Sequence, residues 1–479
     1  MRNFLACIVI NNVCKRFSSS LVKYHAPPEY ISRLRECYRL EEYKKIVVPI
    51  FKKALLYGNR VAVADTTGEY SYLQLYMNSK RLSKQISNIC GSGSSSSVGC
   101  FGSNDVLTIL NLWACWISGQ VAIPLKSTWK FENLQEIIME SKIKLLITSK
   151  DAREVAQKLA KSQEIVLITV DYDFAKNQSY SFNFNREIFM ADKLVVFEGL
   201  LQNNFYTNAD AMKIYSIDGA EDDKKLQNYI LTHNHINSEM KDIANVWNIS
   251  ANDRILNILP SFNTNSFVSN QMFPLILGST LQIHYPFDPV KAWSIILGIN
   301  VPVKDRINLV VAESKIFDLL IMEHERIFSK DSRMVEYIRD YCTKHIHLMI
   351  CCGNNLSVST FSKWFGITGH SLFENHHITK YKSKLKELQP EKEKQSNANL
   401  PNTILPECKF RIIDSENNVL MESYGDSIMA HYKQVSGTLI GHLWISSPGQ
   451  DTFIDSGKIV SYENGNIVVL GPSNKSKQQ

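Results

Sequence analysis

The stretch SNDVLTILNLWACWISGQVAIPL, from Ser103 to Leu125, decides the fold class of this 479-residue chain. Its first part is apolar at helical spacing and predicts a helix over Asp105–Ser118. The short apolar run that follows, Val121–Leu125, has the length of a buried strand. Buried strands that alternate with helices are the repeating unit of parallel α/β layers, so the stretch favours an α/β fold.

The same alternation extends on both sides of this stretch. Short apolar runs predict strands and longer periodic segments predict helices, at Val61–Asp65, Leu73–Ile89, Val98–Phe101, Phe131–Ser141, Lys144–Ser149, Ala152–Lys161 and Glu164–Val170. The pattern resumes at Met212–Ile217, His233–Val246, Arg254–Pro260, Ser266–Leu277, Thr280–His284, Ile307–Val311, Lys315–Phe328, His345–Cys351 and Leu356–Phe365. Gly278 stands where a helix C-terminal glycine is expected. Two such stretches indicate two parallel-sheet α/β subdomains.

The last part of the chain has a different character. A charged tract over 380–399 is followed by apolar runs without long helices, at Cys408–Ile413, Leu439–Ser446, Thr452–Ser461 and Asn466–Leu470. Asn464-Gly465 between two such runs is a strong hairpin signal. We therefore expect α/β subdomains at 27–205 and 206–380, a charged loop at 381–402, a small antiparallel β subdomain at 403–472 and a disordered tail at 473–479.

The first 26 residues are basic and contain no acidic side chain. Arg2, Lys15, Arg16 and Lys23 accompany an apolar run and three consecutive serines, which is the composition of a mitochondrial transit peptide. A short secretory signal is the alternative, but the positive charges follow the apolar run. Without this segment the chain carries 49 basic and 47 acidic side chains, so its charge gives no case for nucleic acid. No stretch reaches the roughly 20 apolar residues of a membrane helix, so we expect no integral membrane association.

The ten cysteines form no C-x-x-C pair and no ligand-spaced cluster with histidine. The sequence therefore predicts neither a disulfide scaffold nor a metal site. The adjacent Cys351-Cys352 end an apolar run, where a reduced cysteine behaves as a small hydrophobic residue. This usage fits a reducing compartment such as the mitochondrial matrix.

Three segments carry a family resemblance. The opening stretch, GNRVAVADTTGEYSYLQLYMNSKRLSKQI before it and LMICCGNNLSVSTFSKWFGITGHSLFENHHITK at Leu348–Lys380 resemble the AMP-forming acyl-CoA synthetases, within them the mitochondrial branch that activates malonate. The resemblance covers about residues 45–472. It implies the large N-terminal domain of the adenylate-forming fold, in agreement with the pattern above. Members of this family activate a carboxylate with ATP as an acyl adenylate and transfer the acyl group to coenzyme A.

The family's phosphate loop corresponds to SIDGAEDDKKLQNYI at Ser216–Ile230. Gly219 alone remains of its glycines, Ser216 retains one hydroxyl, and Lys224 or Lys225 stands in for its lysine. Four acids would face an anionic triphosphate: Asp218, Glu221, Asp222 and Asp223. Like charges about 4 Å apart repel by about 4 kcal/mol at an effective dielectric constant near 20. Carboxylates that hold Mg²⁺ are the functional alternative; we expect instead a solvated acidic loop that does not bind nucleotide.

The resemblance implies three further losses in the nucleotide site. Gly353 corresponds to the region beside adenine. Thr379 keeps a hydroxyl that touches phosphate in relatives, but Lys380 replaces the glutamate that positions Mg²⁺. Lys458 replaces the aspartate that accepts hydrogen bonds from both ribose hydroxyls, and Pro472 replaces an arginine. Relatives continue into a further domain that supplies an active-site lysine, whereas this sequence ends at Gln479, so we expect no such lysine here.

Two hypotheses follow. The first is a catalytically inactive acyl-CoA synthetase homologue of the mitochondrial matrix, without catalytic residues, that regulates or scaffolds an active acyl-CoA synthetase or another mitochondrial protein, or binds a ligand without turnover. The alternative is an active malonyl- or short-chain fatty acyl-CoA synthetase with altered ATP contacts. Only the alternative requires ATP with Mg²⁺ and coenzyme A.

Overall fold

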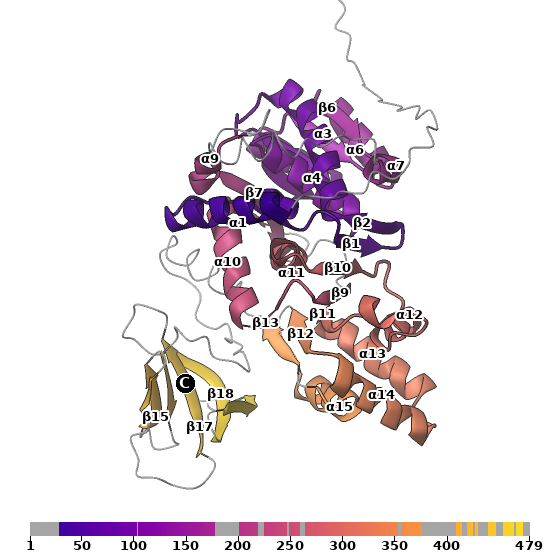
Figure 1. Ribbon diagram of the computed structural model, residues 1–479, viewed down its shortest axis with the longest axis vertical. Helices are drawn as coiled ribbons and strands as arrows, with labels where there is room; N and C mark the ends of the chain where they lie inside the picture. The colour runs from indigo at the N-terminus through magenta and orange to yellow at the C-terminus, as the bar shows by residue number, and fades with distance from the viewer. Residues whose placement is uncertain are drawn as a thin grey trace, which may run out of the picture. The chain divides into compact units, whose positions relative to one another are not determined.

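The computed structural model describes most of the chain (Figure 1). The described residues are 28–102, 104–177, 201–218, 225–246, 249–258, 264–352, 357–370 and 372–375, followed by the strands 409–413, 419–424, 427–429, 439–446, 454–463 and 466–472. The expected transit peptide, charged loop and C-terminal tail lie outside them and stay predictions. Two compact units, Met1–Asn308 and Leu309–Gln479, divide the chain.

The first unit contains a six-stranded sheet in the order β6-β5-β3-β4-β7-β8. Its strands are β3 (Ser97–Phe101), β4 (Val121–Leu125), β5 (Leu145–Thr148), β6 (Val166–Thr169), β7 (Asp210–Asp218) and β8 (Lys225–Thr232). All neighbours are parallel except β7 and β8, which form an antiparallel hairpin. A parallel sheet with one antiparallel edge strand is a common form of the α/β fold.

The helices of this unit begin with α1 (Pro28–Tyr43), α2 (Ile50–Lys53), α3 (Tyr72–Cys90), α4 (Val106–Ile117), α5 (Phe131–Ser141), α6 (Arg153–Ser162) and α7 (Tyr172–Lys176). They continue with α9 (Asn203–Asn208), α10 (His233–Val246), α11 (Thr264–Leu277) and α12 (Pro289–Ile296). Short 3₁₀ turns lie at Ala54–Leu56 and Val303–Asp305.

Helix α4 comes from the stretch that decided the fold class. Asp105 caps it by accepting a hydrogen bond from the Thr108 amide at 3.1 Å, which satisfies one of the free N–H groups of the first turn. Gly119, with φ of 72°, lies two residues past its end. Every residue of α4 is buried, as expected for a helix that is apolar on all sides.

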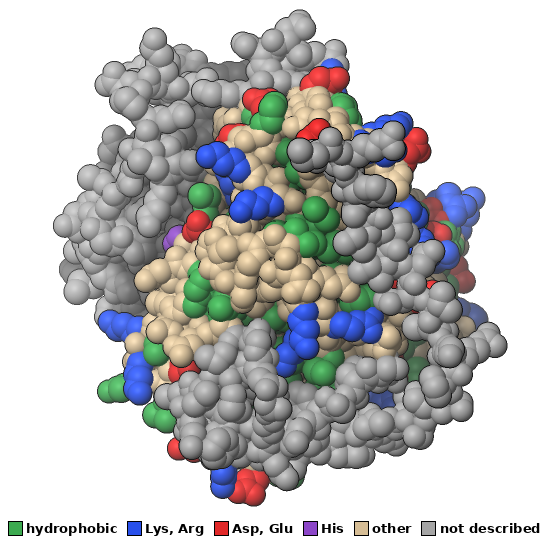
Figure 2. All heavy atoms as spheres, turned by 90° about the horizontal axis from the view of Figure 1, so that it is seen from above, with side chains coloured by type: hydrophobic (Ala, Val, Ile, Leu, Met, Phe, Trp, Pro, Cys, Tyr) green, Lys and Arg blue, Asp and Glu red, His purple; other side chains and the backbone are tan. Residues whose placement is uncertain are grey.

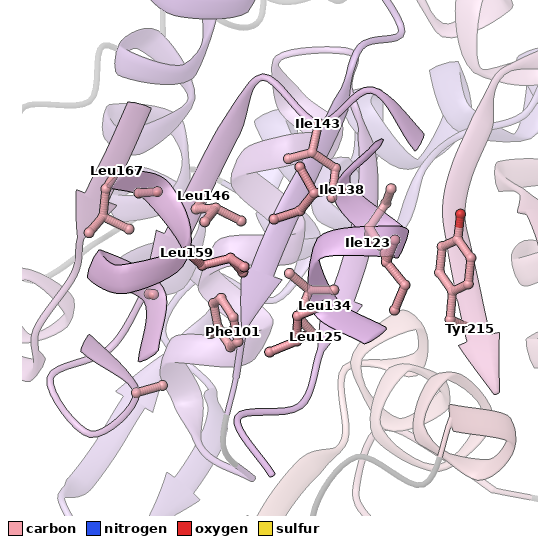
Figure 3. Close-up of a cluster of buried hydrophobic side chains, with 14 residues drawn as sticks. Phe101, Ile123, Leu125, Leu134, Ile138, Ile143, Leu146, Leu159, Leu167 and Tyr215 are labelled. Carbon is pink, nitrogen blue, oxygen red and sulfur yellow. The ribbon is translucent and has the colours of Figure 1, made fainter. Parts of the chain in front are cut away.

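The core of the six-stranded sheet lies between its strands and the helices α5 and α6 (Figure 3). Phe101 and Leu146 from the strands pack with Leu134 and Leu159 from the helices. Tyr215 of β7 closes one side of this cluster and is fully buried. The core therefore includes the first strand of the β7–β8 hairpin.

A second group of strands in the same unit follows the order β9-β10-β1-β2. Strands β9 (Arg254–Ile258), β10 (Thr280–Ile283) and β1 (Val61–Asp65) are parallel, and β2 (Gly68–Ser71) folds back on β1. Each of these two sheets therefore combines strands from distant parts of the chain: β1 pairs with β10 in one, and β4 pairs with β7 in the other. The expected subdomain limit at 205/206 stays a prediction.

The second unit begins with three parallel strands, β11 (Leu309–Glu313), β12 (Leu348–Cys352) and β13 (Phe373–Asn375). Its helices are α13 (Ser314–Ile327), α14 (Ser332–His345) and α15 (Val358–Thr368).

The other strands of this unit form an antiparallel sheet in the order β16-β15-β14-β17-β18-β19. They are β14 (Lys409–Ile413), β15 (Val419–Tyr424), β16 (Ser427–Met429), β17 (Leu439–Ser446), β18 (Ile454–Glu463) and β19 (Asn466–Pro472). Glu463 pairs with Asn466, so the expected hairpin connection falls at Asn464-Gly465. The predicted fold class, parallel α/β sheets with a small antiparallel β part, is confirmed.

No helix among the described residues is both long enough and apolar enough to cross a membrane.

A substitution at Gly278 tests how tightly the end of α11 is packed. Its φ of 84° lies in the left-handed region, and a Cβ atom here would overlap the Tyr57 ring. We expect Gly278→Ala to lower the free energy of unfolding by about 2–4 kcal/mol, because backbone strain and overpacking add. Gly366→Ala is the control: Gly366 lies inside α15 with open space around it, so alanine should be neutral or slightly stabilising. Urea unfolding of both variants measures this, and equal effects would contradict the assignment.

Candidate functional site

The expected phosphate loop forms the end of the β7–β8 hairpin. The register runs without a break from Met212 opposite Leu231 to Asp218 opposite Lys225. Ser216 lies opposite Gln227 inside this ladder. The six residues between the paired Asp218 and Lys225 lie outside the described part of the chain; their sequence includes three acids and one lysine.

The register also places a charge partner beside one candidate lysine. Lys225 is the first residue of β8 and lies directly opposite Asp218. Gly219 and Lys224 lie outside the described residues, so their predicted roles stay predictions.

The hairpin is anchored to α4 and α5 by polar contacts. Lys213 Nζ lies 3.1 Å from Glu140 Oε1 of α5, and Asn228 Nδ2 donates to the same oxygen at 2.8 Å. Trp116 Nε1 donates to the Ala211 carbonyl at 2.9 Å, which joins the buried helix α4 to β7. These contacts hold both strands in place up to the turn.

Directly after β8, His233 begins α10 inside an aromatic pocket. Its ring lies edge-on to Trp116, with 5.5 Å between centroids, and to Tyr206, at 4.9 Å. Burial lowers the pKa of His233 to about 3, because the charged imidazolium would lose its hydration there. The histidine is therefore neutral at physiological pH, and it serves packing rather than proton transfer.

A buried polar network that the sequence did not predict ties the N-terminal helices to α9. Lys52 Nζ donates to the Leu201 carbonyl at 2.9 Å and to Asn203 Oδ1, and Asn203 Nδ2 donates to Glu41 Oε2. Burial lowers the pKa of Lys52 to about 8, although the Glu41 carboxylate opposes this shift. Its partners lie about 150 positions away in sequence, so no local pattern could reveal the network.

Two positions of the expected nucleotide site, one for the ribose aspartate and one for the family arginine, are neighbours in the antiparallel sheet. Lys458 of β18 lies directly opposite Pro472 of β19. Paired residues of an antiparallel ladder have Cβ atoms about 4.5–5.5 Å apart. The two predicted substitutions therefore fall at one place in the sheet, and their effect on nucleotide binding stays a prediction.

The remaining candidates are not brought into a described site. Gly353, Thr379 and Lys380 lie outside the described residues, and their roles stay predictions. Cys351 and Cys352 are buried at the end of β12, the position expected for core cysteines. Within the described part of the chain, no group of three or more His, Cys, Asp or Glu side chains is arranged to hold a metal ion.

On the face drawn in Figure 2, lysine and arginine side chains lie dispersed among hydrophobic and neutral ones rather than in one continuous patch. This described face therefore offers no concentrated field for a polyanion.

Comparison with known proteins shows what the chain is similar to. The profile of the AMP-binding enzyme family matches residues 50–195. The mitochondrial malonate–CoA ligase ACSF3 of Xenopus laevis is 27% identical over 372 residues, which are 76% of this chain and 60% of the relative. The human enzyme of the same name is 27% identical over 338 residues, covering 69% and 54%. The chain thus spans little more than half the length of these relatives.

Solved structures agree with the fold. Apo MatB from Rhodopseudomonas palustris superposes with a TM-score of 0.58 at 16% identity, covering 89% of this chain and 79% of MatB. Unliganded O-succinylbenzoate coenzyme A synthetase from Bacillus subtilis gives 0.54 at 15% identity, covering 89% and 83%.

The fold is that of the N-terminal domain of adenylate-forming enzymes, and these matches show that the chain is similar to AMP-forming acyl-CoA synthetases. It is an acyl-CoA synthetase-like protein, similar to the malonate–CoA ligases that carry the designation mitochondrial.

The neutral state of His233 makes the fold sensitive to acid. The pKa of His233 is about 3 in the folded chain and ordinarily near 6.5. Below pH 6.5 the unfolded chain therefore binds a proton at this histidine that the folded chain does not bind. Stability is thus lost as the pH falls from 6.5 toward 3. His233→Phe keeps the aromatic shape without titrating, and between pH 7 and 4.5 we expect it to lose about 2–3 kcal/mol less than the wild type in urea unfolding. Parallel losses would contradict a buried neutral His233.

Lys52 makes the stability of the fold depend on pH in the alkaline range. Its folded pKa of about 8 lies below the ordinary 10.5, so stability rises as the pH climbs from about 8 to 10.5 and the folded chain sheds this proton first. Lys52→Met keeps an apolar stem without the amine. We expect the wild type to gain on the order of 3 kcal/mol relative to Lys52→Met across this range, measured by urea unfolding. If the free energies of unfolding of the wild type and Lys52→Met differ by the same amount at every pH, burial does not lower the pKa of Lys52.

Proposed function

We propose that this chain is an acyl-CoA synthetase homologue of the mitochondrial matrix that does not form an acyl adenylate, and that acts by binding a protein partner or an acyl or coenzyme A ligand. The observation that carries the proposal is the register of Lys458 opposite Pro472. Both positions correspond, by the family resemblance, to ligands of the nucleotide, and both have lost the required chemistry at the same place in one sheet.

The hairpin supports the same proposal. Its turn is limited to six residues with three acids, and Lys225 is paired in register with Asp218. Phosphates of ATP would meet negative charge at the turn, where repulsion of about 4 kcal/mol for a close pair reduces affinity about a thousandfold. The packed core around Tyr215 remains intact beneath the turn. A preserved scaffold with an acidic turn favours a binding role.

The location of the proposed function follows from its relatives and its N-terminal composition. The matched malonate–CoA ligases carry the designation mitochondrial, and residues 1–26 have the composition of a transit peptide. An active acyl-CoA synthetase is one suitable partner, because the homologue would share its fold and compartment.

Calorimetry with Mg·ATP tests this proposal. We expect the full chain to give no saturable heat up to about 1 mM ATP, a ceiling of about −4 kcal/mol of binding free energy. It should release no AMP when malonate or a short-chain fatty acid is added with coenzyme A. The human malonate–CoA ligase, assayed in parallel, shows that the conditions support both signals.

Lys458→Ala distinguishes the alternative of an active ligase with altered contacts. If Lys458 binds a phosphate of ATP where relatives use an aspartate, the wild-type chain binds ATP at micromolar concentration and Lys458→Ala binds ATP more weakly. That result, together with AMP release, would overturn the proposal.

A further inference from the structure

The edge strands of the described sheets differ in how well they are protected. An edge strand exposes unpaired N–H and C=O groups, and proteins usually shorten it or place charge or proline on it. Strands β2 and β6 have four residues each, β13 and β16 have three, and β19 has seven but ends at Pro472. Strand β8 is also an edge in the described sheet order and has eight residues.

The sequence of β8, KLQNYILT, carries none of the usual protection. Lys225 is its only charged residue, it contains no proline or glycine, and its pairing with β7 has no irregularity between Leu231 and Lys225. Gln227 and Ile230 are exposed, the latter by 49%. A long, regular edge with its only charge at the first residue is a template for another extended strand.

We propose that two copies of this chain associate by antiparallel pairing of β8 with the second copy's β8, centred on Asn228, to form one continuous sheet. The first six residues of β8 belong to the segment that the family resemblance assigns to the phosphate loop, but the pairing uses only the edge of the strand, so the inference does not depend on whether the chain forms acyl adenylates.

The alternation of side chains restricts the register. Residues directly opposite each other must point to the same face, so their numbers must both be even or both be odd. Pairing centred on Asn228 places Leu226 opposite the second copy's Ile230 and Ile230 opposite the second copy's Leu226. Leu226 already packs against the edge of the core cluster, so each pair extends an existing apolar surface.

Charge favours a second copy in this antiparallel arrangement. Lys225 then lies opposite the second copy's Leu231, whereas a parallel arrangement in register would set the two Lys225 residues side by side. The neighbouring charges do not oppose the contact, since Lys213 and Glu140 form an ion pair at 3.1 Å. The strand is therefore complementary to itself. An interface of one strand pair is small, so the complex is expected in the weak, micromolar range.

Sedimentation velocity over about 1–200 µM of the full chain tests the association. We expect a monomer–dimer equilibrium, with Ile230→Lys raising the dissociation constant at least tenfold, because the lysine would lie opposite the second copy's Leu226. Ile299→Lys is the matched control, since Ile299 is 50% exposed and lies outside β8. It should leave the equilibrium unchanged, and circular dichroism verifies that both variants are folded.

Cysteine cross-linking tests the register. Asn228→Cys lies on the twofold axis, where directly paired residues have Cα atoms about 4.5–5.5 Å apart, within reach of a disulfide. Under mild oxidation with oxidised glutathione, we expect a reducible band at twice the 54.7 kDa mass of the chain. Gln227→Cys, an exposed neighbour displaced from the axis, should cross-link at least several-fold more slowly, and the wild type gives the background.

Three results would overturn the proposal. They are a monomer at every concentration, a dimer that Ile230→Lys leaves intact, and equal cross-linking of the two cysteine variants.

Discussion

The hydrogen bond from Trp116 to the Ala211 carbonyl joins the two parts on which the first unit depends. One is α4, an entirely buried helix, and the other is the start of the β7–β8 hairpin. A buried indole N–H without an acceptor would be costly, so this contact fixes where β7 can lie. With β7 in place, Tyr215 closes the core and His233 enters its aromatic pocket. The position of the candidate phosphate turn is therefore a result of core packing.

Local sequence patterns predicted the elements that are regular and continuous. The apolar period from Asp105 to Leu125 predicted α4 and β4, and Gly278 was recognised as a helix-ending glycine. Strand β8 was not predicted, because KLQNYILT mixes polar and apolar residues without clear alternation at an edge. Helix α14 was also missed, since its exposed residues dominate its composition.

The arrangement of the strands could not be predicted from local pattern. Nothing near Val61–Asp65 indicates that β1 pairs with β10, more than 200 positions later. The Lys52, Asn203 and Glu41 network is equally non-local. Of the candidate site, the sequence supplied residue identities, and the structure added that Lys458 and Pro472 are cross-strand neighbours and that Lys225 faces Asp218 in register. The fold resembles that of acyl-CoA synthetases, and the altered chemistry at the expected nucleotide positions stays a prediction.

The pairing of β1 with β10 also shapes how the chain reaches its native state. Val63 must pair with Leu281, 218 positions later, and the segment between them includes the whole six-stranded sheet. At a synthesis rate of about 5–20 residues per second, β10 emerges on the order of 10–40 s after β1. During that interval β1 and β2 remain a two-stranded hairpin, which is marginal alone in water. Such long-range closure is slow and leaves apolar surface exposed while the chain folds.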